Sequence, residues 1–191
     1  MRRSSLLALA LAPAVLFAQP AASDEVTEAL EAALEAWSGG DVATAKSEAE
    51  WALAKIGEAE ALGLAEYLPP APEGWTRRDE DPQSAGAAMF GGGLMAAASY
   101  TGPGDAGTAT VALADDSPMV AAMGTMFGNS AAMNSLGRAV RAGRHRAVIT
   151  GDGELQALIG GRTLVTIAGR ASEETKQALF SAIDLDALAA R

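Results

Sequence analysis

Apolar residues recur at helical spacing in the first part of the chain. Their positions follow i, i+4, i+7, i+8 and i+11, which places them on one face of a helix: Val26, Leu30, Ala33, Leu34 and Trp37. Glycines at 39 and 40 interrupt this stripe, and Asp41 can cap a second helix. The second stripe is alanine-rich: Val42, Ala45, Ala49, Ala52, Ile56 and Ala59. Two such helices in succession predict an antiparallel helical hairpin over residues 24–68.

A different pattern begins after a proline-rich segment. Residues 69–75 contain Pro69, Pro70 and Pro72, which favour an extended backbone and predict a linker. Beyond it, short apolar runs bounded by glycine predict five strands, at 94–100, 108–114, 145–150, 155–159 and 163–168. Glycine-rich turns at 151–153 and 160–161 make the last three an antiparallel meander. The charged residues 77–84 are expected to form a loop.

Helices are expected to interrupt these strands. Ser117 and Pro118 are typical of a helix start, and a short second helix is expected to end near Leu136. Ser172 opens the last helix, with Leu179 among its apolar positions. The order β-β-α-β-β-β-α predicts an α+β domain over residues 76–191, an antiparallel five-stranded sheet with helices on one face.

The N-terminus has the features of an export signal. Arg2 and Arg3 precede the apolar run 6–17, and the small residues 21–23 fit a cleavage site near Ser23. We therefore expect a signal peptide over 1–23 and a secreted, periplasmic protein, with Sec and twin-arginine export both open. The chain contains no cysteine. This excludes disulfides, thiolate chemistry and a lipoprotein anchor.

Acidic residues dominate the charge. The whole chain carries a net charge of −10, and without residues 1–23 it has twelve basic against twenty-four acidic residues, or −12. The segment 24–68 contains eleven of these acids against Lys46 and Lys55: Asp24, Glu25, Glu28, Glu31, Glu35, Asp41, Glu48, Glu50, Glu58, Glu60 and Glu66. Such a protein repels nucleic acid. No apolar run after residue 23 is long enough for stable membrane insertion, so the expected partner is another periplasmic protein.

Two resemblances accompany these patterns. The spacing Gly40-Asp41-Val42-x-x-Ala45-x-x-x-Ala49-x-x-Ala52-Leu53 resembles the second half of a tetratricopeptide repeat, present once and so implying a lone helix pair. The layout also resembles uncharacterised exported bacterial proteins with a helical hairpin and a small α/β domain. The shared features are the 68–75 join, Asp116-Ser117-Pro118 and Gly161-Arg162-Thr163-Leu164-Val165. More loosely, the second unit is similar to Mog1/PsbP-type sandwiches, which implies a fold and no activity.

Methionines form one candidate site. Met119, Met123 and Met126 share a helical face, continued by Met133. Thioethers are soft ligands that suit Cu(I), but flexible methionines also fill apolar cores. We expect core packing and no cofactor, and copper is the alternative.

Arginines form a second candidate site. Arg138, Arg141, Arg144 and Arg146 surround His145, the single histidine. They could receive a carboxylate, a phosphate or the acidic hairpin, and we interpret them as an interaction surface. An exposed polar edge of a strand pair would explain the same residues.

No pattern in the chain is typical of an enzyme. Ser117 would need His145 to act as a nucleophile, and it lacks the Gly-x-Ser-x-Gly turn. We therefore expect a non-catalytic periplasmic accessory or protein-interaction protein. The alternatives are a methionine-based copper-handling protein and a small-ligand module with a methionine-lined pocket. Methionines packed against the sheet would favour the first reading, and sulfurs converging at an opening would favour the others.

Overall fold

The computed structural model describes residues 22–81, 94–115, 118–127 and 129–191. The chain divides into two compact units, residues 1–52 and 53–191. The division falls inside helix α2 (Val42–Ala65), so the end of this helix belongs to the second unit. Residues 1–21 of the expected signal peptide and the expected Ser117 cap lie outside the described residues.

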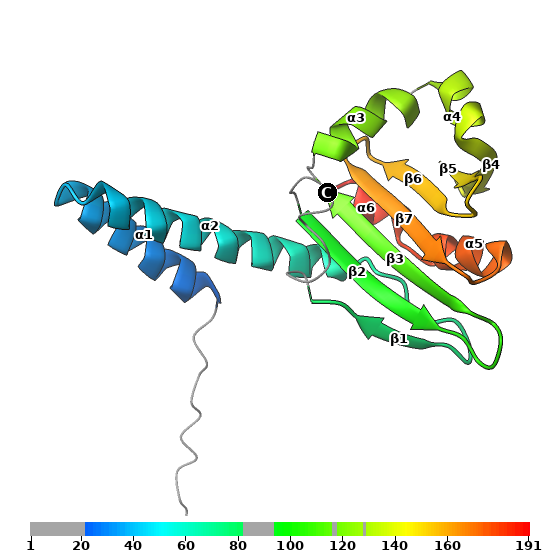
Figure 1. Ribbon diagram of the computed structural model, residues 1–191, viewed down its shortest axis with the longest axis horizontal. Coiled ribbons are helices and arrows are strands. Elements are labelled where there is room, and N and C mark those ends of the chain that lie inside the picture. Colours follow the sequence, from blue (N-terminus) through cyan, green and yellow to red (C-terminus); the bar gives the residue numbers. More distant parts are fainter. Residues whose placement is uncertain (1–21, 82–93, 116–117, 128) are drawn as a thin grey trace, which may run out of the picture. The chain divides into compact units, whose positions relative to one another are not determined.

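Unit 1 contains α1 (Ala22–Ser38) and the first half of α2, which together form the predicted helical hairpin (Figure 1). At the turn, the Gly39 amide donates to the Glu35 carbonyl at 2.9 Å. Asp41 caps α2 as expected, because its carboxylate accepts from the Thr44 amide at 3.1 Å and from the Thr44 hydroxyl at 2.7 Å. These hydrogen bonds, led by the one from the hydroxyl, lower the pKa of Asp41.

Among the described residues of unit 1, the buried ones are alanines. Ala29 of α1 and Ala45 and Ala52 of α2 are each at most 7% exposed. Small side chains allow the close helix contact that the sequence suggests. The larger members of the predicted stripe on α1 are not buried in this way, since Leu34 and Trp37 are 66% and 65% exposed.

Unit 2 is built on one antiparallel sheet of seven strands in the order β1-β2-β3-β7-β6-β5-β4 (Figure 1). The strands are β1 (Thr76–Asp79), β2 (Leu94–Thr101), β3 (Thr108–Asp115), β4 (Gly137–Ala142), β5 (His145–Thr150), β6 (Leu155–Ile159) and β7 (Thr163–Gly169). The α+β class is confirmed, and five of the strands lie where the sequence predicts them. Positive φ angles at Gly153, Gly160 and Gly161 form the expected turns.

The predicted strand number, five, is wrong because both edge strands were missed. β1 reads Thr-Arg-Arg-Asp with mostly exposed side chains, and β4 buries one side chain, Val140. An edge strand pairs on one side and is often charged. It therefore lacks the apolar run that identifies a central strand in a sequence.

Helices cover both faces of the sheet, which corrects the expectation of one. On one face α5 (Glu173–Ser181) and α6 (Leu185–Ala189) pack on Leu113 and Val165. On the other, α3 (Pro118–Phe127) places Val120 against Ala114 and Leu164. The central strands thus bury consecutive residues, which point to opposite faces. α4 (Ser130–Leu136) follows α3 and contacts β4 and β5.

The proline-rich segment, expected as a linker, packs within unit 2. Leu68 and Pro69 are buried, and the hydroxyl of Tyr100 on β2 donates to the Pro69 carbonyl at 2.6 Å. Arg77 Nη1 donates to the Leu68 and Pro69 carbonyls at 2.9 and 3.1 Å. Leu64, near the end of α2, completes this contact with the core. The segment is therefore an integral part of the sheet domain.

A truncation series tests this assignment. Residues 53–191 should melt cooperatively, whereas residues 76–191 lose Leu64 and Leu68 and expose Tyr100, so they should melt at least about 10 °C lower or without a cooperative transition. Calorimetry of the two fragments measures the difference. Equal melting temperatures would show that the proline segment adds nothing to the core.

The buried hydroxyl of Tyr100 should make the folded protein less stable at alkaline pH. Burial raises its pKa from 10.0 to about 12. The folded state therefore keeps a proton that the unfolded state loses between these values, and unfolding free energy falls across that pH window by about 2–3 kcal/mol. Below pH 10 this contribution is intact. Tyr100→Phe should remove this part of the fall in urea titrations, and Tyr67→Phe is the control. An unchanged slope in Tyr100→Phe would contradict the assignment.

Candidate functional site

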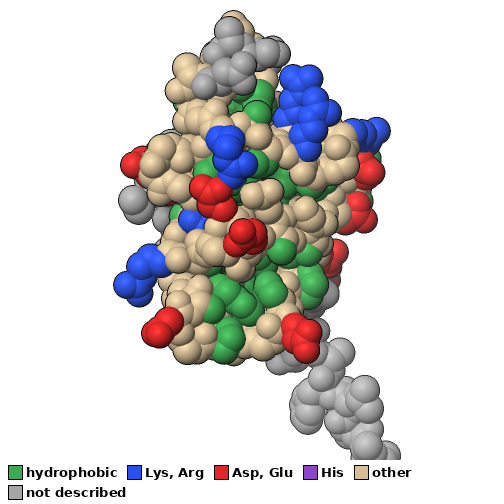
Figure 2. Space-filling view, turned by 90° about the vertical axis from the view of Figure 1, so that its right-hand side faces the viewer, with side chains coloured by type: hydrophobic (Ala, Val, Ile, Leu, Met, Phe, Trp, Pro, Cys, Tyr) green, Lys and Arg blue, Asp and Glu red, His purple; other side chains and the backbone are tan. Residues whose placement is uncertain are grey.

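The four arginines of the β4–β5 hairpin do not form one surface. Side chains alternate between the two faces of a strand, and Arg138 lies on the α5 face, where it pairs with Glu173. Arg144, in the turn, pairs with Asp186 of α6 at 2.7 Å. Arg141 and Arg146 oppose each other directly and share the other face. Figure 2, which views the right-hand side of Figure 1, shows Lys and Arg side chains in separate groups with acidic side chains close by.

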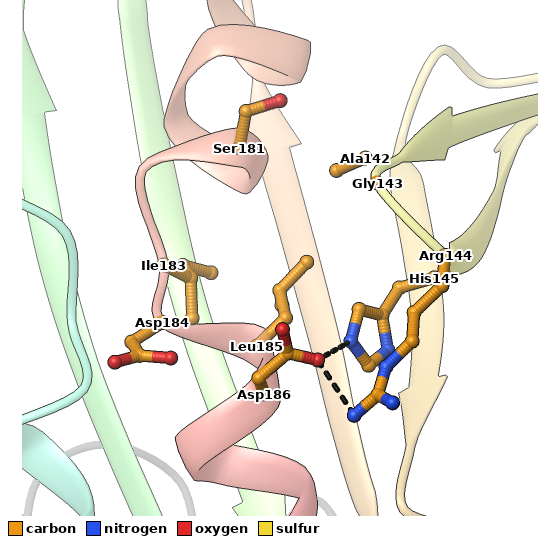
Figure 3. Close-up of a pocket in the computed structure, with 9 residues that line it drawn as sticks. All are labelled: Ala142, Gly143, Arg144, His145, Ser181, Ile183, Asp184, Leu185 and Asp186. Carbon is orange, nitrogen blue, oxygen red and sulfur yellow. Dashed lines mark hydrogen bonds and ion pairs between the residues drawn. The ribbon is translucent and has the colours of Figure 1, made fainter.

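A pocket of about 250 Å³ opens between this hairpin turn and the junction of α5 and α6 (Figure 3). Residues 142–145 form one wall, and Ser181 with residues 183–186 form the other. Asp186 lies between the walls, and its Oδ1 contacts His145 Nε2 at 2.9 Å as well as Arg144. The hydrogen bond from His145, followed by the charge of Arg144, lowers the pKa of Asp186.

This arrangement fastens the turn to α6. The His145 side chain is only 14% exposed and its Nε2 is held by Asp186. Asp184, on the pocket wall, accepts from the Ala187 amide at 3.0 Å as the N-cap of α6. The charged groups of the pocket, Arg144, Asp184 and Asp186, and the His145 ring therefore have structural partners. Neither the sequence pattern nor the arginine cluster indicated this pocket, because α6 is far from His145 along the chain.

The methionines of α3 differ in their surroundings. Met123 packs against the cluster of Ala114, Val120 and Leu164, whereas Met126 is 38% exposed. Met133, on α4, is buried at 5%. The side chain of Met119 lies outside the described residues. Met123 and Met126 thus point into different environments, so the described sulfurs give no sign of a shared opening, and copper binding stays a prediction.

No acidic or imidazole metal centre is found in the parts of the chain that the structure describes, where His, Asp and Glu residues do not gather in threes at ligating distance. Over the same residues, no helix is both long enough and apolar enough to cross a membrane.

A buried carboxylate at the end of β3 is a second polar feature of unit 2. Asp115 Oδ1 accepts from Thr163 Oγ1 at 3.2 Å and from Arg162 Nε at 3.3 Å. Its Oδ2 lies 3.7 Å from Arg191 Nη1. The Arg191 guanidinium also lies over the Tyr67 ring at 5.9 Å. A charge buried at 1% side-chain exposure requires such partners, so the cluster ties β3, β7 and the last helical segment together.

Helix α1 exposes a group of large apolar side chains. Three of the five residues of the predicted stripe, Leu30, Leu34 and Trp37, are 49%, 66% and 65% exposed, and these three are called the α1 stripe from here on. Their helical spacing is visible in the sequence, but spacing alone does not distinguish a face packed on α2 from an exposed one. The abundance of alanine in both helices was the available indication that smaller residues form that contact.

Comparison with known proteins adds no identity: no family model matches the chain, and neither the curated proteins nor the solved structures contain a match. The resemblances to exported bacterial proteins and to Mog1/PsbP-type sandwiches therefore stay predictions. The function has to be argued from the site itself.

The methionine environments give a testable difference. Met123→Ala should lower the unfolding free energy by about 1–3 kcal/mol because it leaves a cavity beside Val120, whereas Met126→Ala should cost less than about 0.5. Met123→Leu keeps the volume and should cost less than about 1.5. Urea unfolding gives these values. Tight Cu(I) binding that is lost in the Met123→Leu, Met126→Leu double variant, with unchanged stability, would overturn core packing.

Proposed function

We propose that this protein is a non-catalytic, exported accessory protein that binds another periplasmic protein through its N-terminal hairpin. The observation that carries the proposal is the exposure of the α1 stripe, Leu30, Leu34 and Trp37. Single exposed apolar residues are ordinary, but a contiguous group with polar surroundings is typical of a protein interaction site. Tryptophan and leucine at helical spacing also suit the buried centre of an interface.

The sheet domain supports a binding role in a different way. Its pocket at the β4–β5 turn has His145 and Arg144 tied to Asp186, and its buried carboxylate, Asp115, is held by arginines. Groups occupied in this way stabilise the fold and are poorly placed to transfer a proton to a substrate. The unit therefore suits a rigid carrier for the hairpin.

Site-specific crosslinking tests the proposal. A photoreactive residue at position 34 should crosslink to a defined protein in cells, and one at position 28, on the polar side of α1, should crosslink much less. The identified protein, purified, should bind the mature chain, and Leu34→Ser should weaken binding at least about tenfold, since it removes one anchor. Equal crosslinking at both positions, or binding unaffected by Leu34→Ser, would contradict an interface on the α1 stripe.

A further inference from the structure

The α1 stripe is not a by-product of hairpin packing. Ala29, buried at 4%, lies on a side of α1 different from Leu30 and Leu34, because successive helical residues are separated by about 100°. The hairpin is already closed through its alanines. The stripe, spanning residues 30–37 or about 10 Å of helix, is therefore available to something else.

Carboxylates define the outer edge of this stripe. Glu31 and Glu35 each follow a stripe leucine by one position, so both lie on the same flank of Leu30 and Leu34. Both are exposed. Any helix that covers the leucines therefore brings its own flank close to these two acids.

The charge of the hairpin disfavours a second copy of this chain as the molecule that covers the α1 stripe. Residues 24–52 carry eight acids against Lys46, which is paired with Glu50 at 3.6 Å: Asp24, Glu25, Glu28, Glu31, Glu35, Asp41, Glu48 and Glu50. Pairing two such hairpins would bring like charges together without compensation. A partner with Lys or Arg at this surface avoids the repulsion, and its positive charges are attracted to the carboxylates.

We propose that the α1 stripe receives an amphipathic helix of the partner protein, with an apolar face bordered by Lys or Arg. Leucine-type anchors at i, i+3 or i+4 and i+7 would cover Leu30, Leu34 and Trp37, and the basic border would face Glu31 and Glu35. This inference rests on the proposed function and deepens it, because it names the chemistry of the partner.

A pair of synthetic peptides tests the occupant. The probe is a helix of about 15 residues with leucine at i, i+3, i+4 and i+7 and lysine beside the leucines, and the matched peptide has glutamate in place of lysine. Anisotropy of the labelled peptide, titrated with the full mature chain, should show binding of the lysine peptide and at least about tenfold weaker binding of the glutamate peptide. Equal binding of the two peptides would overturn the proposal.

Matched variants locate the site. Leu34→Ser should raise the Kd of the lysine peptide about tenfold, and Leu62→Ser, the same change at a comparably exposed leucine of unit 2 (63%), should change it less than about twofold. Glu31→Gln with Glu35→Gln should weaken binding and reduce its salt dependence. Glu66→Gln with Glu73→Gln removes the same charge in unit 2 and should have the smaller effect. Equal effects within either matched pair would show nonspecific attraction and refute the site.

Two further outcomes separate this inference from the proposed function. A dimer in light scattering that Leu34→Ser dissociates would make a second copy the occupant and overturn the basic partner. A protein crosslinked at position 34, together with no binding of the lysine peptide, would keep the interface and refute the basic helix. Failure of both experiments would remove both proposals.

Discussion

The sheet domain depends on one hydrogen bond in a buried position, from the Tyr100 hydroxyl to the Pro69 carbonyl. Prolines lack the amide donor that strand pairing requires, so this segment does not join the sheet as a strand, and the carbonyls of Leu68 and Pro69 accept from side chains. Tyr100 and Arg77 provide these donors. With the segment fixed, Leu68 and Leu64 reach the core, and β1 begins where it can pair with β2. The hydrogen bonds to the Leu68 and Pro69 carbonyls therefore help to fix the segment that leads into β1.

This constraint gives the two units different physical characters. Unit 2 has a core with aromatic and branched side chains, including Phe180, Leu113 and Ile167. Among the described residues of unit 1, the buried side chains are alanines, Ala29, Ala45 and Ala52, and each removes little apolar area from water. Because alanines make the contact between the two helices, larger side chains such as Leu34 and Trp37 remain exposed. The proposed binding surface and the larger apolar core therefore lie in different parts of the chain.

The sequence predicted elements best where packing leaves a local pattern. The strands at 145–150 and 155–159 were placed with the bounds that the structure has, because apolar runs between glycine turns report burial directly. β1 and β4 left no such pattern, since edge strands expose charge. The Asp186–His145 contact joins residues distant in the chain and depends on the break between α5 and α6. The spacing on α1 predicted the hairpin correctly but not the exposure of Leu30, Leu34 and Trp37, because spacing identifies a face and not what covers it.

The two edge strands have a consequence for the behaviour of the protein at high concentration. An open sheet ends in unpaired backbone groups, which can template the addition of a strand from another molecule. Here β1 exposes Arg78 and β4 exposes Arg141 along these edges. Two copies that met edge to edge would place guanidinium groups side by side in the new ladder. The charged residues that replace the apolar pattern of a strand at these edges therefore also oppose growth of the sheet into aggregates.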